Sequence, residues 1–382
     1  IQKACGKLLN DRAGSISVMD IYTGDIIAMY SSPSYDPNKF LFGISNDDWA
    51  LIRNNPLKPL INKTLSGLYS PGSTIKPIVA LSALENKIVS PNFKVKCTGK
   101  MELYGQTFHC WKEKGHGFMS LKNAMKQSCD TYFYEVARLL GVDRLNVTAE
   151  KFGLGKKVLG DYYDYEKSGL FPNTKWKKNN LGKGWVLGET LITGIGQGYT
   201  QTTPLQLCLM TAQIANGGYS IKPRIVVNNN PMSLEEAKSK LQEETLHGQE
   251  KKLFKDHKNI KIVQEAMFSS TNELYGTSYK SRIDNPKYQF AGKTGTAQVK
   301  RISMRERELD LKIEQIPYKD RDHALFVAYG PYVNPRYALS IIVEHGGSGS
   351  RTAAPIAKEL FKLIIDRDKL RNKQKNFEEI DI

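Results

Sequence analysis

Apolar and polar residues alternate along two stretches near the start of the chain. Residues 14–31 contain both stretches, separated by a glycine-containing turn at residues 23–25. A period of two on either side of such a turn predicts a β-hairpin. Three further stretches, 288–299, 323–330 and 337–344, have the same strand character. We therefore expect the two ends of the chain to share one antiparallel sheet.

Helical patterns fill most of the chain between these strands. An apolar run after Ser73 predicts a helix that begins there, with Ile78, Val79, Leu81 and Leu84 on one face. Further helices are expected at 1–9, from Ser120 to about 127, at 131–140, 204–215, within 233–274, and at 352–366. The stretches 31–63 and 153–200 are expected to be long connections, 90–118 to be irregular, and 300–321 to be a charged excursion between two strands.

These elements together predict an α+β fold. We expect a single domain over residues 1–366, with an antiparallel sheet flanked by helices. A helical subdomain, roughly residues 77–285, is expected to be inserted between the N-terminal and C-terminal parts of the sheet. Residues 367–382 are rich in charge and are expected to form a fraying tail.

The composition is that of an ordinary globular protein, with 40% hydrophobic and 25% charged residues among 382. No apolar stretch reaches the roughly 18 residues that a membrane-spanning helix needs. The chain begins without methionine and inside a predicted helix, so we expect it to be a fragment that lacks an upstream portion.

The chain carries a formal net charge of +16. A charge of this size is compatible with nucleic acid, an anionic membrane surface or an acidic polymer as partner. The basic residues are scattered, however, with only short runs such as 175–178 and 369–375. They form no helix-length stripe and no nucleic-acid-binding module. General surface charge is therefore the favoured interpretation, and no nucleic-acid partner is expected.

The candidate chemistry begins at Ser73 and Lys76. A serine at the first turn of a helix lies on the same face as a lysine three residues later. The lysine amine can then take the proton of the serine hydroxyl, provided that its pKa is lowered by burial or by nearby positive charge. The amides at the helix N-terminus also offer donors to an oxyanion. Alone, this short pattern occurs often by chance.

Two further patterns follow in order: Ser128-Cys129-Asp130, and Lys293-Thr294-Gly295-Thr296. The order and separation resemble the three-part signature Ser-x-x-Lys, Ser-x-Asn and Lys-Thr-Gly of the penicillin-interacting serine enzymes. With residues 196–199 and 344–347, nearly the whole chain looks like a class B penicillin-binding protein, most like the penicillin-binding protein 2 group of cell-elongation transpeptidases. Asp130 departs from the usual Asn, as members of that group also tend to do.

The resemblance implies a D,D-transpeptidase that cross-links peptidoglycan stem peptides through a serine acyl-enzyme and is acylated by β-lactams. Ser73 is then the nucleophile and Lys76 its base. Ser128 relays a proton to the leaving D-Ala nitrogen, Asp130 orients Lys76 or substrate amides, and Lys293 offers positive charge to the substrate carboxylate.

The rest of the third motif binds substrate under the same resemblance. Thr294 and Thr296 offer hydroxyls, and Gly295 lets the backbone approach closely. The backbone N–H groups of Ser73 and Thr296 are the expected oxyanion hole. The non-catalytic alternatives are a solvated Lys76, a capping Ser128 and an ordinary edge-strand lysine.

Other functions share these motifs. A D,D-carboxypeptidase differs only in using water as the acceptor, and a β-lactam sensor domain looks similar. A serine β-lactamase needs an activated water, and Glu166 lacks the Asn that follows the glutamate in class A enzymes. A non-catalytic scaffold would require that Ser73 does not act as a nucleophile.

Three cysteines and a histidine form a possible zinc site. Cys97, Cys110, His116 and Cys129 provide the Cys3His set of a tetrahedral structural zinc, although no Cys-x-x-Cys is present. Flanking glycines favour His116 over His109. Some relatives in the penicillin-binding protein 2 group hold a metal at corresponding places. A Cys97–Cys110 disulfide and buried free thiols remain the alternatives.

The resemblance also extends beyond this chain. It implies an upstream single-pass anchor in the bacterial inner membrane and a pedestal module, with the catalytic domain in the periplasm. It further implies a SEDS-family glycosyltransferase and the elongation machinery as partners. Zinc would be a structural ion, because the acyl-transfer chemistry needs no cofactor.

Overall fold

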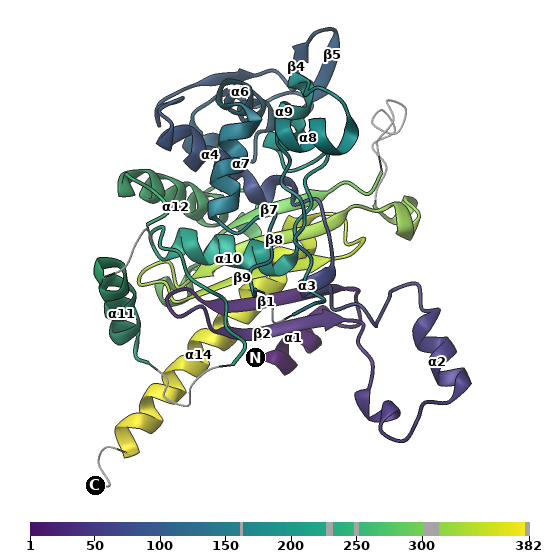
Figure 1. Cartoon of the computed structure of the whole chain (residues 1–382). Helices are drawn as coiled ribbons and strands as arrows, with labels where there is room; N and C mark the ends of the chain where they lie inside the picture. The colour runs from purple at the N-terminus through teal and green to yellow at the C-terminus, as the bar shows by residue number, and fades with distance from the viewer. Residues whose placement is uncertain (161–162, 227–231, 248–251, 301–312, 379–382) are drawn as a thin grey trace.

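The strands predicted at the two ends of the chain form one sheet, as the computed structural model shows (Figure 1). The structure describes residues 1–160, 163–226, 232–247, 252–300 and 313–378. The strands of this sheet are β1 (Gly14–Asp20), β2 (Ile26–Ser32), β7 (Ala291–Ala297), β8 (His323–Gly330) and β9 (Tyr337–Val343). Their order is β2-β1-β9-β8-β7, and every pair is antiparallel. The predicted hairpin and shared sheet are confirmed.

The two faces of the sheet bury different partners. Alternate residues of β8, such as Phe326, pack with α1 (Gln2–Leu9) and α14 (Ala354–Glu378) on one side. The neighbouring Leu325 and Val327 face a larger core formed with the helices of the middle of the chain. In that core α10 (Pro204–Ala215) is buried along its whole length and crosses β9 and β1. The strand period of two thus separates the two cores.

The chain between β2 and β7 is mainly helical, and α4, α6, α7, α8 and α9 lie above the sheet in Figure 1. Besides α10, the helices of this part are α2 (Asn46–Arg53), α3 (Lys63–Ser66), α4 (Lys76–Glu85), α5 (Leu121–Lys126), α6 (Asp130–Leu140), α7 (Val142–Lys151), α8 (Thr174–Leu181), α9 (Leu187–Gly194), α11 (Leu234–His247) and α12 (His257–Asn272). Short 3-10 turns are η1 (Pro37–Phe40), η2 (Gly72–Ile75), η3 (Tyr279–Ser281), η4 (Pro286–Tyr288), η5 (Ile313–Gln315) and η6 (Tyr318–Asp320), and η7 (Gly349–Ala353) is a π-turn.

Several predicted connections contain regular structure. The stretch 90–118, expected to be irregular, holds two small antiparallel pairs: β3 (Val95–Cys97) with β6 (Gly117–Met119), and β4 (Lys100–Leu103) with β5 (Gln106–His109). The stretch 153–200 contains α8 and α9 rather than loops alone. Strands of three or four residues and helices of eight are too short to give a clear period in the sequence.

The predictions for the last helices were partly wrong. Helices were expected within 233–274 and are present, but α12 is not peripheral, because it buries Ile260, Val263 and Met267 against α4, α5 and β7. The final helix was expected to end near residue 366, yet α14 continues to Glu378. Most of the charged excursion 300–321 lies outside the described residues.

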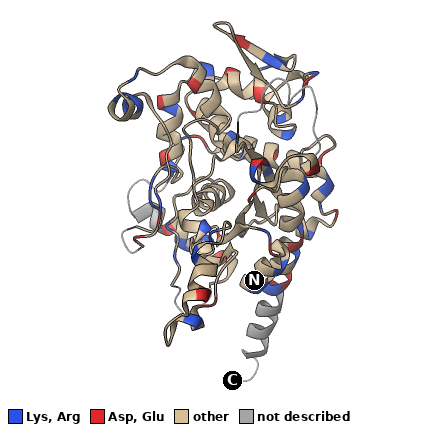
Figure 2. Ribbon diagram, turned by 90° about the vertical axis from the view of Figure 1, so that its right-hand side faces the viewer, with Lys and Arg blue, Asp and Glu red and all other residues tan. Residues whose placement is uncertain are grey.

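Along the described part of the ribbon, Lys and Arg are interspersed with Asp and Glu (Figure 2). Among the helices that the structure describes, none combines the length and the apolar character needed to cross a lipid bilayer.

Candidate active site and metal centre

Ser73 lies in a tight turn between the helical part and the sheet. It belongs to the 3-10 turn η2, and α4 begins three residues later at Lys76, so Ser73 precedes the α-helix instead of opening it. Gly72 has a positive φ of 52°, and a Cβ there would lie 2.4 Å from the carbonyl oxygen of Thr296. Only glycine therefore lets the serine turn approach β7 so closely. Ser73 itself is half-buried.

Lys76 is fully buried and points toward the second motif. Its Nζ donates to Asp130 Oδ1 at 2.7 Å, to the Ser128 carbonyl at 3.0 Å and to Ser128 Oγ at 3.3 Å. The aromatic ring of Phe133 lies 5.2 Å from the same nitrogen. A solvated role for Lys76 is excluded, because its side chain is fully buried and its Nζ has three acceptors within 3.3 Å.

Lys293 reaches Ser128 from the opposite side. Its Nζ donates to Ser128 Oγ at 2.8 Å and to the Thr294 carbonyl at 3.0 Å. Burial, followed by the positive charge of Lys76, lowers the pKa of Lys293 well below its usual value, while Asp130 opposes this shift. Ser128 has a positive φ of 54°, an uncommon conformation for serine. The structure thus brings all three motifs together around one hydroxyl.

The strand β7 brings the rest of the third motif next to the serine turn. A Cβ on Gly295 would lie 2.6 Å from Thr74 Cγ2 and 3.0 Å from the Pro71 carbonyl oxygen. The Thr296 carbonyl accepts a hydrogen bond from Gln197 Nε2 at 3.0 Å. In the sequence, Gln197 lies within the stretch 196–199, which contributes to the family resemblance. Its hydrogen bond to β7 depends on the fold, and no local pattern in the sequence predicts it.

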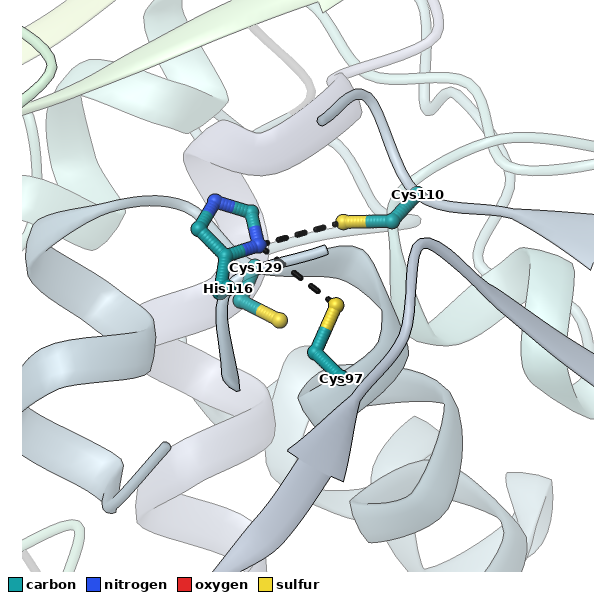
Figure 3. Close-up of side chains that lie close together, drawn as sticks. All are labelled: Cys97, Cys110, His116 and Cys129. Carbon is teal, nitrogen blue, oxygen red and sulfur yellow. Dashed lines mark hydrogen bonds between the residues drawn. The ribbon is translucent and has the colours of Figure 1, made fainter. Parts of the chain in front are cut away.

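The four predicted metal ligands meet beside this site (Figure 3). Their ligand atoms all lie within 4.8 Å of one another. His116 Nδ1 is 3.5 Å from Cys97 Sγ and 3.6 Å from Cys110 Sγ, and the Cys129 thiol points to the same place. All five cysteines of the chain are free thiols. His116, rather than His109, belongs to this cluster.

The cluster has the dimensions of a tetrahedral zinc site. Zinc binds sulfur at about 2.3 Å and imidazole nitrogen at about 2.0 Å, which places two such ligands about 3.5 Å apart. A hydrogen bond from Cys129 lowers the pKa of the Cys110 thiol, and His116 lowers it further against the effect of burial, whereas the contact with Cys110 and burial raise the pKa of Cys129. Thiolate character is what a metal ligand requires. His116 Nε2 is buried without a partner among the described residues, so contacts at Nδ1 orient the ring.

Trp111 joins the metal cluster to the catalytic cluster. It follows Cys110, and its backbone N–H donates to Asp130 Oδ2 at 3.0 Å. Its indole N–H donates to the Ser128 carbonyl at 3.1 Å. Cys129 stands between Ser128 and Asp130 in the chain. No pattern in the sequence singles out Trp111, because its partners lie 17 and 19 residues away along the chain.

Comparison with known proteins now identifies the family. A model described as "Penicillin binding protein transpeptidase domain" matches residues 14–362. This chain belongs to that family. Curated relatives named peptidoglycan D,D-transpeptidase MrdA are 35% identical in Salmonella typhimurium over 369 residues, and 34% identical in Escherichia coli over 369 residues. Each match covers 96% of this chain.

Solved penicillin-binding proteins 2 have the same fold. The Pseudomonas aeruginosa protein in complex with WCK 5153 aligns with a TM-score of 0.78 at 38% identity, covering 93% of this chain and 72% of that one. The Helicobacter pylori protein in complex with MreC aligns with a TM-score of 0.79 at 31% identity, covering 94% and 62%. The predicted transpeptidase fold is therefore confirmed. The chain spans 58% of the Salmonella relative and 56% of the Escherichia coli relative.

Proposed function

We propose that this chain is the catalytic domain of a peptidoglycan D,D-transpeptidase of the cell-elongation type. The observation that supports this most is the pair of buried lysines, Lys76 and Lys293, which both bond the Ser128 hydroxyl close to the Ser73 turn. Such an arrangement suits a serine that must be deprotonated and a leaving group that must be protonated.

In the proposed acylation, Ser73 Oγ attacks the carbonyl carbon of the D-Ala-D-Ala peptide bond. Lys76, as the free amine, accepts the hydroxyl proton, and the backbone amides of Ser73 and Thr296 stabilise the oxyanion. Collapse of the tetrahedral intermediate breaks the C–N bond. The proton passes from Lys76 through Ser128 Oγ to the nitrogen of the departing D-Ala. The hydrogen bonds at Ser128 support this route.

In the second half-reaction, the amine of an acceptor stem peptide attacks the acyl-enzyme ester. A new amide bond forms and Ser73 is released with its proton restored. A D,D-carboxypeptidase would use water at this step. A β-lactamase is disfavoured, because both carboxylate oxygens of Glu166 accept backbone N–H groups of Val158 and Leu159 and are not directed to an attacking water.

We further propose that Cys97, Cys110, His116 and Cys129 hold a structural zinc ion. The ion would supply a tetrahedral cross-link between β3, the segment after β5 and the start of α6. Neighbouring residues would connect this cross-link to the catalytic lysine: the Trp111 backbone N–H donates to the Asp130 carboxylate, which in turn accepts a hydrogen bond from Lys76. The dimensions of the ligand cluster support this proposal more strongly than a Cys97–Cys110 disulfide.

The wider setting is proposed from the relatives. One of them was solved with MreC, and another neighbour is described as part of a peptidoglycan synthase complex. By analogy, the full protein would be anchored in the bacterial inner membrane and act in the periplasm with a SEDS-family glycosyltransferase and the elongation machinery. Co-purification of the full-length protein with these partners tests this assignment.

Native mass spectrometry with benzylpenicillin tests the proposed activity. We expect a single drug adduct that persists for hours, is absent in Ser73→Ala, and is retained in Ser168→Ala, which alters an exposed serine. Loss of the adduct within seconds, with consumption of the drug, would instead identify a β-lactamase. Failure of the wild type to form any adduct would refute the proposal. The untreated mass also reveals one bound zinc ion or a disulfide.

A further inference from the structure

One segment near the active site carries a large share of the positive charge of the chain. Residues 167–188 contain five lysines and no aspartate or glutamate, against a formal net charge of +16 for the whole chain. Four of these lysines are exposed: Lys167, Lys175, Lys178 and Lys183. The proposed acyl-transfer chemistry uses none of them. Whether this charge belongs to a binding surface depends on where the fold places it.

The loop that follows α9 connects this segment to the active site. The N–H of Gly72, in the serine turn, donates to the carbonyl of Gly196 at 2.9 Å. A Cβ on Gly196 would lie 2.2 Å from the Gly72 carbonyl oxygen, so the loop touches the serine turn directly. The next residue, Gln197, donates through Nε2 to the Thr296 carbonyl of β7 at 3.0 Å. Tyr199, two residues further along, therefore lies beside the active site.

Tyr199 forms an aromatic pair with Trp176 of α8. Their ring centroids are 5.3 Å apart and the rings are inclined at 57°. The Trp176 backbone N–H donates to the side chain of Asn173 at 2.7 Å, which fixes this residue at the start of the helix. Tyr199 is 36% exposed and Trp176 is partly exposed. Such a pair offers a large, rigid contact area, and the negatively polarised ring faces attract the C–H groups of a sugar ring.

A largely buried ion pair holds the aromatic pair in place. Lys177 Nζ donates to both carboxylate oxygens of Glu189, at 2.5 Å and 2.7 Å. The Tyr199 hydroxyl donates to the same carboxylate at 3.4 Å. Glu189 directly follows the lysine-rich segment in the chain. Its charge is thus balanced by Lys177 and is not available to the exposed lysines.

The exposed lysines keep their charge unbalanced. Lys175 and Lys178 lie three residues apart on one face of α8, and Lys183 follows the end of that helix. Among the described residues, none of these three lysines forms an ion pair. Asp143 reaches the start of α8, where its carboxylate accepts hydrogen bonds from the N–H and the hydroxyl of Thr174. The surface therefore combines unpaired positive charge with exposed aromatic rings.

These two features match the chemistry of one polymer. In peptidoglycan, the proposed substrate, peptides with free carboxylates are attached to chains of sugars. The carboxylates are complementary to the lysines, and the sugar rings are complementary to the aromatic faces. Because Gln197 and Tyr199 connect the surface to the active site, a strand whose peptide enters the site can lie across both.

We propose that Lys175, Trp176, Lys178, Lys183 and Tyr199 form a second binding surface for the peptidoglycan polymer, here called the α8 surface. Sugar rings pack on Trp176 and Tyr199, and the lysines bind carboxylates of stem peptides other than the one being acylated. This inference rests on the proposed transpeptidase function. It deepens that function by assigning recognition of the polymer to residues outside the three motifs.

Co-sedimentation with purified, protein-free peptidoglycan sacculi tests the α8 surface. The chain is first acylated with benzylpenicillin, so that binding measures contacts outside the blocked active site. We expect the dissociation constant to rise with salt, because exposed charges are screened. The double variant Lys175→Gln, Lys178→Gln should bind about fivefold more weakly, as expected for the loss of two exposed charge pairs. Trp176→Ala should bind at least about tenfold more weakly, and Trp176→Phe should restore most of this loss.

Sacculi whose carboxylates have been converted to amides separate the two contributions. The wild type and the lysine double variant should bind these neutral sacculi equally well, because the charge pairs are already lost. Trp176→Ala should remain weaker than the wild type on them. If the lysine double variant shows the same deficit on neutral sacculi as on native ones, carboxylate binding by the α8 surface is overturned.

A matched control lies on α12, where Lys258 and Lys261 are exposed and have the same three-residue spacing. The double variant Lys258→Gln, Lys261→Gln loses the same charge and should bind native sacculi within about twofold of the wild type. Equal weakening by both double variants, or by neither, overturns the inference. The lysine variants decide the test if Trp176→Ala does not fold. A wild type that forms a penicillin adduct but does not bind sacculi overturns this inference alone, whereas a wild type without an adduct refutes the proposed function.

Discussion

Replacing Cys129 by alanine should slow acylation, although this side chain performs no chemistry. Cys129 stands between Ser128 and Asp130, and the cluster that it completes includes Cys110, which precedes Trp111. Trp111 donates to Asp130 Oδ2 at 3.0 Å and to the Ser128 carbonyl at 3.1 Å. Loss of one ligand loosens this support. Residues that support a functional cluster in this way typically contribute about 10- to 100-fold in activity.

The effect of the proposed zinc ion on stability can be estimated. A ligand present at a thousand times its dissociation constant stabilises the folded state by about 4 kcal/mol. For 382 residues, an unfolding entropy of about 2.1 cal/mol/K per residue gives about 0.8 kcal/mol/K. Removing the zinc should therefore lower the Tm by about 5 °C. The Tm of the Cys129→Ala variant should be lower than that of the wild type, and a chelator should lower it less.

The assay combines scanning calorimetry, with and without a chelator, and stopped-flow acylation by a fluorescent penicillin. Cys208→Ala is the matched control, because Cys208 is also a fully buried thiol but lies in α10, where it bonds the carbonyls of Ser17 and Ala338. This variant should keep the wild-type response to the chelator and the wild-type acylation rate. Cys129→Ala with normal acylation and an intact fold would refute the proposed support. If the chelator leaves the wild-type Tm unchanged and the mass spectrum shows no zinc, the proposed metal site is refuted.

Three other perturbations test individual parts of the site. Burial holds the pKa of Lys293 well below its usual value of 10.5. Between these two pKa values the unfolded chain binds a proton that the folded chain lacks, so stability rises with pH up to 10.5. Lys293→Met should flatten this slope in urea titrations over about two pH units below 10.5, and an equal slope would contradict the burial of the amine. Tyr69→Phe removes the 2.6 Å hydrogen bond from the Tyr69 hydroxyl to the Glu344 carboxylate. This change should lower the free energy of unfolding by about 2 kcal/mol, and an unchanged value would mean that the bond is not formed. Gly295→Ala forces its Cβ against Thr74 and should slow penicillin acylation about a hundredfold, whereas Gly184→Ala, which meets open space, should not.

The sequence contained enough to predict the sheet and the three motifs. Strand periodicity identified both ends of the chain, and the motif order linked Ser73, Ser128 and Lys293 over more than 200 residues. The burial of Lys76 was not visible in the local sequence, and only the fold shows it. The four candidate metal ligands were identified by residue type alone, and only the fold shows that they meet.

The parts that escaped prediction depend on contacts between distant residues. The pairs β3–β6 and β4–β5 are too short to impose a period, and their pairing joins segments on either side of the metal cluster. Trp111 acts through its backbone N–H, which every residue except proline has.

Ser128 shows why these elements depend on one another. Its positive φ of 54° costs a residue other than glycine about 1–3 kcal/mol, so the surrounding structure must impose it. The contacts that do so are hydrogen bonds to its carbonyl from Lys76 Nζ and from the Trp111 indole. This conformation directs the hydroxyl between the two lysines, at 3.3 Å from Lys76 and 2.8 Å from Lys293. The strain is therefore sustained by Lys76 on one side and by Trp111 on the other, so a change at Cys129, between Ser128 and Asp130, should affect acylation before it affects the fold.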